Sequence, residues 1–165
     1  IIRDPRDVVV SLSKHMGIDI NIAIEEMLSN TKRMTSVHKV NELVSTWKNN
    51  VDSWMQFKKV PRLILKYEDM IDNTDESFHQ IIEFLNNIGN FNINTNKVFL
   101  EFVKLSTSFK KLQFLEKQKH FDEASSHSKF FRKGTSGGWK KELTKKQAKQ
   151  IERELSIPMK QLEYL

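Results

Sequence analysis

The residues that open the chain read IIRDPRDVVVS (residues 1–11), and they predict how this part of the molecule folds. Two isoleucines suit the end of a buried strand, and Asp4 followed by Pro5 is typical of an N-cap and the first position of a helix. Arg3 therefore stands at a strand-to-helix junction, in front of backbone N–H groups that lack intrahelical partners. Such a junction favours an anionic ligand. Because a strand needs neighbours, we also expect the N-terminal part of the domain to precede these residues.

The composition is that of an ordinary soluble protein, with 38% hydrophobic and 29% charged residues. A chain of 165 residues is long enough for one domain with a hydrophobic core. There is no cysteine, which excludes disulfides and thiolate metal sites, and no apolar run approaches the roughly 18 residues that cross a bilayer. We therefore expect a single domain over residues 1–165, N-terminally truncated, without a membrane span and located in the cytoplasm.

Positive charge is concentrated late in the sequence. The net charge is +6, and residues 129–149 hold eight Lys or Arg and one acid, Glu142. This segment favours an anionic partner. Because Phe130, Phe131 and Trp139 could stack on bases, a module that binds nucleic acid or another polyanion is one hypothesis for function. A solvated, lysine-rich surface is the other interpretation of the same residues.

Apolar spacing and capping residues predict a mostly helical chain with two short strands. Helices are predicted over residues 5–16, 37–57, 74–85, 98–105, 109–117 and 144–155, and residues 20–32 predict a further helix or a lid. Residues 62–67 predict a buried parallel strand with Glu68 and Asp69 at its carboxyl end, where open α/β sheets bind ligands. Residues 86–96 and 119–139 predict loops. The pattern favours part of an α/β domain.

Several familiar sites have no counterpart in the sequence. No segment fits the phosphate-binding pattern G-x-x-x-x-G-K-[ST] or the nucleophile pattern G-x-S-x-G. The five histidines are scattered, so we expect no metal site. What remains is a dispersed set of four segments, each with a simple structural explanation when taken alone. They are Arg3 to Ser11, Tyr67 to Asp69, Thr107 to Phe109 and Arg132 to Trp139.

In this order the four segments resemble motifs of the sulfotransferases that depend on 3′-phosphoadenosine 5′-phosphosulfate (PAPS). Residues 3–11 fit the family's Arg-Asn/Asp-Pro-x-Asp-x-x-x-Ser, residues 67–69 its Tyr-Glu-Asp, and residues 107–109 its Thr-Ser-Phe. Residues 132–139 fit its Arg-Lys-Gly-x-x-Gly-Asp-Trp, except that Gly138 replaces the Asp. The resemblance covers roughly the second half of the family's domain. It implies an α/β, P-loop-type three-layer fold with a parallel sheet flanked by helices, of which this chain is a mostly helical C-terminal portion.

The resemblance also implies a cofactor site. In the family, PAPS donates a sulfuryl group to a hydroxyl or amine and leaves 3′-phosphoadenosine 5′-phosphate. The cofactor-binding residues implied here are Arg3, Ser11, Tyr67, Thr107, Ser108, Phe109, Arg132, Lys133 and Gly134. The 3′-phosphate would be held by Arg3, Ser11 and residues 132–139, which we call the late loop. Guanidinium groups bind phosphate bidentately, and Gly134 allows close backbone approach. Tyr67, Thr107 and Phe109 would line the adenine side.

Two parts of the family's chemistry are not among these residues. Its phosphosulfate loop, with a Lys, and its general base both precede the Arg3 motif, so we assign no catalytic residue to this chain. We expect these 165 residues alone not to transfer a sulfuryl group. The expected partner is a small-molecule acceptor with a hydroxyl or amine, and not nucleic acid. A kinase of related architecture is a further alternative, but the Arg3–Ser11 and Arg132–Gly134 pair favours a 3′-phosphate.

Two departures from the family pattern bear on the loop and on assembly. Gly138 removes a carboxylate that could order the late loop, so loop closure is expected to differ. The family's dimer motif, Lys-x-x-x-Thr-Val-x-x-x-Glu, aligns with Lys140, Thr144, Lys145 and Lys149. The Val and the Glu are both Lys here, so dimerisation through this segment is not expected.

Overall fold

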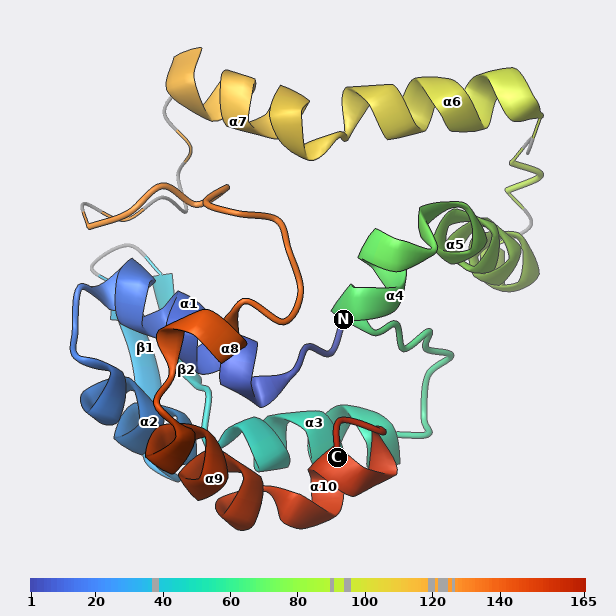
Figure 1. The fold of residues 1–165 in the computed structure, drawn as a ribbon. Helices are drawn as coiled ribbons and strands as arrows, with labels where there is room; N and C mark the ends of the chain where they lie inside the picture. The colour runs from blue at the N-terminus through green and yellow to red at the C-terminus, as the bar shows by residue number, and fades with distance from the viewer. Residues whose placement is uncertain (37–38, 90, 94–95, 119–120, 122–124, 126) are drawn as a thin grey trace. The chain divides into compact units, whose positions relative to one another are not determined.

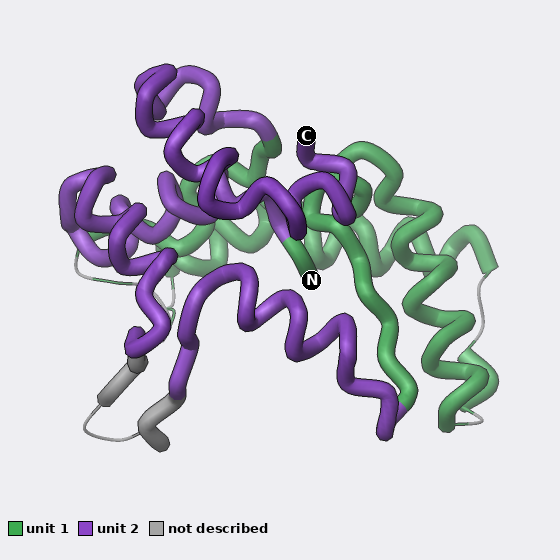
Figure 2. The backbone as a smooth tube through the Cα atoms, turned by 90° about the horizontal axis from the view of Figure 1, so that it is seen from below, with its two compact units in different colours: residues 1–2, 61–136 green, residues 3–60, 137–165 purple. Residues whose placement is uncertain are grey.

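The computed structural model describes residues 1–165 except 37–38, 90, 94–95, 119–120, 122–124 and 126. Its elements in chain order (Figure 1) are α1 (Pro5–Met16), α2 (Ile20–Leu28), β1 (Arg33–Ser36), β2 (Lys39–Leu43), α3 (Trp47–Gln56), α4 (Tyr67–Asp72), α5 (Thr74–Gly89), α6 (Lys97–Ser106), α7 (Phe109–Gln118), α8 (Trp139–Glu142), α9 (Lys145–Glu154) and α10 (Ser156–Gln161). The chain divides into two compact units (Figure 2). Unit 1 contains residues 1–2 and 61–136, and unit 2 contains residues 3–60 and 137–165.

Helix α1 begins and ends where its sequence predicts. The Asp4 side chain accepts a hydrogen bond from the Arg6 N–H (2.9 Å), and Pro5 occupies the first helical position. Gly17 ends the helix in the left-handed conformation, at φ 64°, which costs a glycine little. The local signals in this stretch therefore agree with the structure that forms.

The hydrophobic core of unit 2 is built by α1, α2, α9 and α10. On α1, Val9 is fully buried and Val10 nearly so, and burial of each such side chain contributes roughly 1.5–3 kcal/mol. The buried core residues are Val9, Val10, Ala23, Ile24, Met27, Ile151, Leu155 and Met159. The core thus fixes α1, which follows Arg3, against helices from the end of the sequence.

A buried cation, Arg6, joins the ends of unit 2. Its guanidinium donates to the Asp4 carboxylate through Nε (3.0 Å) and Nη2 (2.8 Å), and to Glu152 on α9 through Nη1 (2.6 Å). Nη2 also donates to the backbone oxygen of Tyr164 (2.9 Å), and the group lies 4.1 Å from the centre of the Trp139 ring. Burial lowers the pKa of Arg6, but hydrogen bonds and charges from Asp4 and Glu152 outweigh it, so the pKa is raised and the group stays charged.

One predicted helix is wrong over part of its length. The spacing predicted a helix over 37–57, but strand β2 lies inside that range and pairs antiparallel with β1. Helix α3 starts later because the Thr46 hydroxyl caps it, accepting a hydrogen bond from the Asn49 N–H (3.0 Å). Val40 and Leu43 precede this cap and continue the three-and-four spacing, but they belong to strand β2. Residues 37–38 lie outside the described residues.

Residues 62–67 do not form the predicted strand. A single parallel bridge joins Ile2 to Lys66, in which the Ile2 N–H donates to the Leu65 oxygen (2.8 Å) and the Tyr67 N–H to the Ile2 oxygen (2.7 Å). The chain enters α1 soon after Ile2 and α4 directly after Lys66, so both segments leave the ladder after one bridge. This bridge is the part of the expected parallel sheet that the described residues contain.

The other predicted elements agree with the structure more closely. The helices predicted over 5–16, 98–105, 109–117 and 144–155 are present with small shifts at their ends. Helix α2 stops at Leu28, α5 continues through Gly89 into the predicted loop, and α10 was not predicted as a separate helix. None of the described helices is long and apolar enough to cross a membrane.

Replacing Arg6 by Met should lower the free energy of unfolding by about 3–5 kcal/mol, because it leaves the buried Asp4 carboxylate and the half-buried Glu152 carboxylate without their cation. The matched control is Arg153→Met, since the side chain of Arg153 is 77% exposed and its ion pair with Glu154 is worth at most about 1 kcal/mol. Urea unfolding of the complete protein measures both. Equal losses for the two variants would contradict the role given to Arg6.

Candidate functional site

A cavity with a volume of about 1090 Å³ lies within unit 1. Helix α4, the start of α5 and the junction between α6 and α7 form its walls. Five of the nine predicted cofactor residues line it: Tyr67, Thr107, Ser108, Phe109 and Gly134. Three separate sequence motifs therefore meet at one pocket, of a size that fits a small-molecule ligand.

The α6–α7 junction presents two hydroxyl groups at this pocket. The Thr107 hydroxyl donates to the Val103 oxygen (2.7 Å), and the Ser108 hydroxyl donates to the Leu105 oxygen (2.9 Å). Each hydroxyl has one proton, which is used by the end of α6, so each oxygen can still accept a hydrogen bond. The junction is therefore an acceptor surface for a ligand.

Gly134 packs directly against the ring of Phe109. Gly134 has φ +61°, and a Cβ atom added there would lie 2.4 Å from Phe109 Cδ2. Phe109 in turn makes an edge contact with Phe131, with ring centres 6.1 Å apart. Glycine is needed at 134 for its backbone conformation and for this close approach. The contact joins the Thr-Ser-Phe motif to the late loop.

Helix α7 holds the backbone just before the late loop through two polar side chains that no sequence motif indicated. Gln113 Nε2 donates to the Phe131 oxygen (2.9 Å). The Glu116 carboxylate accepts hydrogen bonds from the N–H groups of Phe130 (2.6 Å) and Phe131 (3.2 Å). The two residues are one helical turn apart, but nothing in that spacing separates them from other polar residues on a helix surface. They fix the backbone that leads into Arg132.

Tyr67 is the first residue of α4 and is half-buried. The bridge described above holds its N–H on the Ile2 oxygen, and Ile2 is followed directly by Arg3. Glu68 and Asp69 lie in the first turn of α4, whereas the sequence had predicted them at the carboxyl end of a strand. The Tyr-Glu-Asp motif therefore opens a helix beside the pocket.

One side of the pocket is acidic. Asp72, Asp75 and Glu76 line it, together with Lys104, whose Nζ pairs with Asp75 (2.8 Å) and Glu101 (2.7 Å). The hydrogen bonds that the Lys104 ammonium donates to Asp75, and then to Glu101, raise the pKa of Lys104. Because carboxylates repel phosphate, this side suits an uncharged group.

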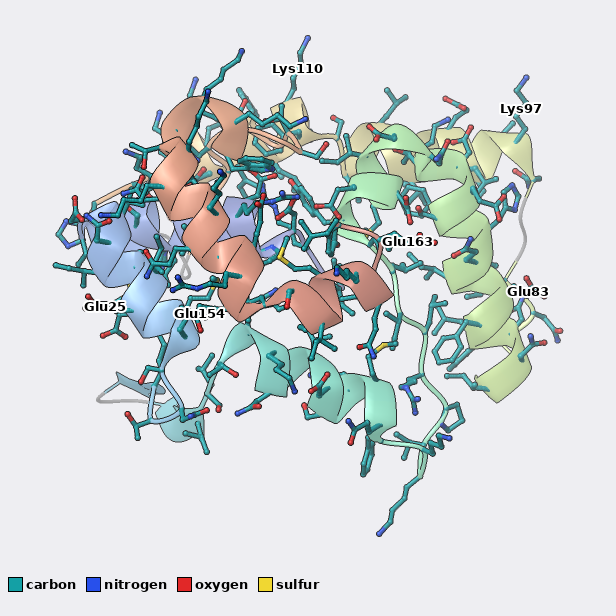
Figure 3. The ribbon with its side chains drawn as sticks, turned by 60° about the horizontal axis from the view of Figure 1, so that its bottom comes forward. Glu25, Glu83, Lys97, Lys110, Glu154 and Glu163 are labelled. Carbon is teal, nitrogen blue, oxygen red and sulfur yellow. The ribbon has the colours of Figure 1, made fainter. Side chains whose placement is uncertain are left out.

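The exposed lysines of α6 and α7 do not face the cavity. Lys97 and Lys110 extend away from the ribbon (Figure 3), and neither lines the pocket. The basic residues nearest in sequence to Gly134 are Arg132 and Lys133, which precede it directly. In the part of the chain that the structure describes, no three His, Asp or Glu side chains gather as metal ligands do.

Arg3 and Ser11 belong to unit 2. Arg3 is half-buried and precedes the Asp4 cap, and Ser11 is exposed on α1, about 10 Å further along the helix axis. The pocket is formed by unit 1 alone, so the joint role of Arg3, Ser11 and Arg132 at one phosphate stays a prediction.

Comparison with known families identifies the class of this chain. The family model described as "Sulfotransferase domain" matches residues 1–163, so the chain belongs to the sulfotransferase family. This confirms the resemblance found in the four motifs.

Individual relatives and solved structures agree with this assignment. Cytosolic sulfotransferase 13 from Arabidopsis thaliana is 28% identical over 163 residues, which cover 92% of this chain and 48% of that protein. The crystal structure of mouse sulfotransferase SULT7A1 complexed with PAP has a TM-score of 0.70 at 23% identity, over 96% of this chain and 57% of that one. Retinol dehydratase, solved with androsterone and the inactive cofactor PAP, has a TM-score of 0.70 at 20% identity, over 96% and 46%. The two structures share the fold, and the chain spans about half the length of the relatives it matches.

Gly134→Ala should destabilise the protein more than Gly137→Ala. Both glycines have positive φ (+61° and +69°), so both variants lose about 1–2 kcal/mol to backbone strain. Only the Cβ at 134 meets the Phe109 ring, whereas nothing lies within 4 Å of a Cβ at 137. We expect a further loss of about 1–3 kcal/mol for Gly134→Ala, from overpacking. Unfolding free energies test this, and equal values for the two variants would contradict the packing described.

Proposed function

We propose that the complete protein transfers a sulfuryl group from PAPS to a hydroxyl or amine of a small-molecule acceptor. Residues 1–165, as a single sulfotransferase domain, supply the part that binds the adenine and the 3′-phosphate. The observation that supports this most is the meeting of three family motifs at one pocket of unit 1, in a chain that belongs to the family. The PAP present in both neighbouring structures supports the same cofactor here.

The pocket residues suit an adenine base. Tyr67 and Phe109 offer aromatic groups for contact with a purine, and the oxygens of Thr107 and Ser108 accept hydrogen bonds such as those of an exocyclic amine. The volume of about 1090 Å³ leaves room for the ribose. Because one side is acidic, the phosphates belong at the end of the pocket that Gly134 lines.

The basic residues of two motifs suit the 3′-phosphate. Arg132 and Lys133 lead into Gly134, which has the left-handed conformation (φ +61°). Successive backbone N–H groups in such a turn can bind an anion. Arg3 and Ser11 add a guanidinium and a hydroxyl on either side of the start of α1. When bound, PAPS supplies the sulfuryl group. These residues hold its nucleotide, and none of them is assigned a proton transfer.

The acceptor and the location are proposed only by class. Androsterone in the retinol dehydratase structure is in keeping with a small-molecule acceptor, and the cytosolic name of the Arabidopsis relative is in keeping with the cytoplasm. The phosphosulfate loop and general base that the family requires have no match in these residues. We therefore expect residues 1–165 alone to bind nucleotide without turnover.

A module that binds polyanions is the second candidate function. It is favoured by five exposed lysines on and beside α8 and α9, which are Lys140, Lys141, Lys145, Lys146 and Lys149. Such a surface would bind long polymers by charge, without preference for a 3′-phosphate.

Calorimetry should show that the complete protein binds adenosine 3′,5′-bisphosphate about ten- to a hundredfold more tightly than adenosine 5′-monophosphate, because the extra phosphate gains charge-assisted hydrogen bonds. Arg3→Ala and Arg132→Ala should each remove most of this preference. Arg153→Ala, an exposed arginine paired with Glu154, should leave it unchanged. Equal affinity for the two nucleotides would contradict the proposal, and tighter binding of an oligonucleotide would favour the polyanion module.

A further inference from the structure

The Asp7 carboxylate is buried and binds the far end of the late loop. Asp7 is 3% exposed and lies in the first turn of α1. Its Oδ2 accepts a hydrogen bond from the Gly137 N–H (2.6 Å), and its Oδ1 accepts one from the Trp139 N–H (2.8 Å). Both of its oxygens are thus used by backbone from more than a hundred residues away.

These contacts differ from the usual role of an acid at this position. An acid in the first turn commonly reaches back to its own N-cap, but the cap of α1 is made by Asp4. Asp7 is therefore available to bind N–H groups of another segment. Hydrogen bonds to an ionised acceptor in a buried setting are stronger than neutral ones. The carboxylate holds the two N–H groups on either side of Gly138.

Gly138 is where this chain departs from its family's pattern. A Cβ atom added at Gly138 would have Asp7 Oδ1 as its nearest neighbour, at 3.6 Å. An acid at 138 would therefore begin beside the Asp7 carboxylate. Because the Asp is absent, the sequence predicted a different loop closure. The structure shows that the loop's exit is nevertheless held by a carboxylate, that of Asp7.

Asp7 and its bonding partner Gly137 each lie close along the chain to one group of proposed phosphate-binding residues. Arg3 precedes it by four positions, on the same turn into α1. Gly134 precedes Gly137 by three positions, which limits the distance between their Cα atoms to about 11 Å. A shift of the loop's exit away from α1 would therefore be passed to Arg132, Lys133 and Gly134 over a short length of chain.

We propose that Asp7 is a positioning residue for the 3′-phosphate: it holds the exit of the late loop against the first turn of α1, so that both basic motifs bind one phosphate. The proposal rests on the function proposed above. Asp7 itself does not touch the ligand in this proposal, because its charge would repel a phosphate and both of its oxygens are already bonded.

The experiment compares Asp7→Asn with Asp19→Asn in the complete protein. Asp19 is the matched control, because its carboxylate also stands at a helix start, where it accepts the Asn21 N–H (2.7 Å), and Asn caps helices equally well. Calorimetry measures binding of adenosine 3′,5′-bisphosphate and adenosine 5′-monophosphate. Hydrogen exchange measures protection of the Gly137 and Trp139 amides.

We expect Asp7→Asn to weaken bisphosphate binding about tenfold while monophosphate binding is unchanged, and to speed exchange at both amides. Asp19→Asn should change neither property. A merely structural role would weaken both nucleotides together, or neither, and either result would overturn the proposal. Unchanged exchange in Asp7→Asn would overturn it as well.

Two further outcomes remain decisive. If Asp7→Asn does not fold, hydrogen exchange is measured in the unmodified protein instead. The bisphosphate should slow exchange at the Gly137 and Trp139 amides more than the monophosphate does. Equal exchange rates with the two nucleotides would overturn the proposal. If the unmodified protein does not prefer the bisphosphate, the proposed function itself fails. That result is distinct from a preference that survives Asp7→Asn, which overturns only the role of Asp7.

Discussion

The first turn of α1 is held by one buried guanidinium, and unit 2 depends on it. Arg6 would be costly to bury alone, but two carboxylates, a backbone oxygen and an indole ring surround it. These groups come from the N-cap, from α8 and α9 and from Tyr164, so a single side chain fixes the ends of unit 2. Asp7, its neighbour, binds the backbone around Gly138. Two adjacent residues of opposite charge thus link the first sequence motif to the last.

The sequence predicted elements best where local chemistry alone determines them. Helix α1 has an N-cap, a proline and a terminal glycine in the expected places, and its bounds were predicted correctly. The helix predicted over 37–57 was wrong in part because periodicity was followed across the Thr46 cap. The strand predicted over 62–67 was wrong because an apolar run does not show how many residues find pairing partners, and here one bridge forms.

The candidate site was predictable only through motifs taken together. Taken singly, Tyr67, Phe109 and Gly134 do not indicate a function. The order of their motifs along the chain indicated a shared site, and all three residues line the pocket of unit 1. The residues that support the loop could not be found in this way. Gln113 and Glu116 act through backbone atoms just before the late loop, and no pattern in the sequence predicts a contact between a helix and a distant stretch of backbone.

The hydroxyl groups at the α6–α7 junction bear on which purine the pocket would accept. Thr107 and Ser108 give their protons to carbonyl groups of α6, so they meet an incoming base with lone pairs. The amino group at C6 of adenine would complement such an oxygen, whereas the C6 oxygen of guanine or hypoxanthine would place lone pair against lone pair. Two hydrogen bonds from side-chain hydroxyls to carbonyl groups at the end of a helix would in this way discriminate against oxo-purines, without any charged side chain taking part.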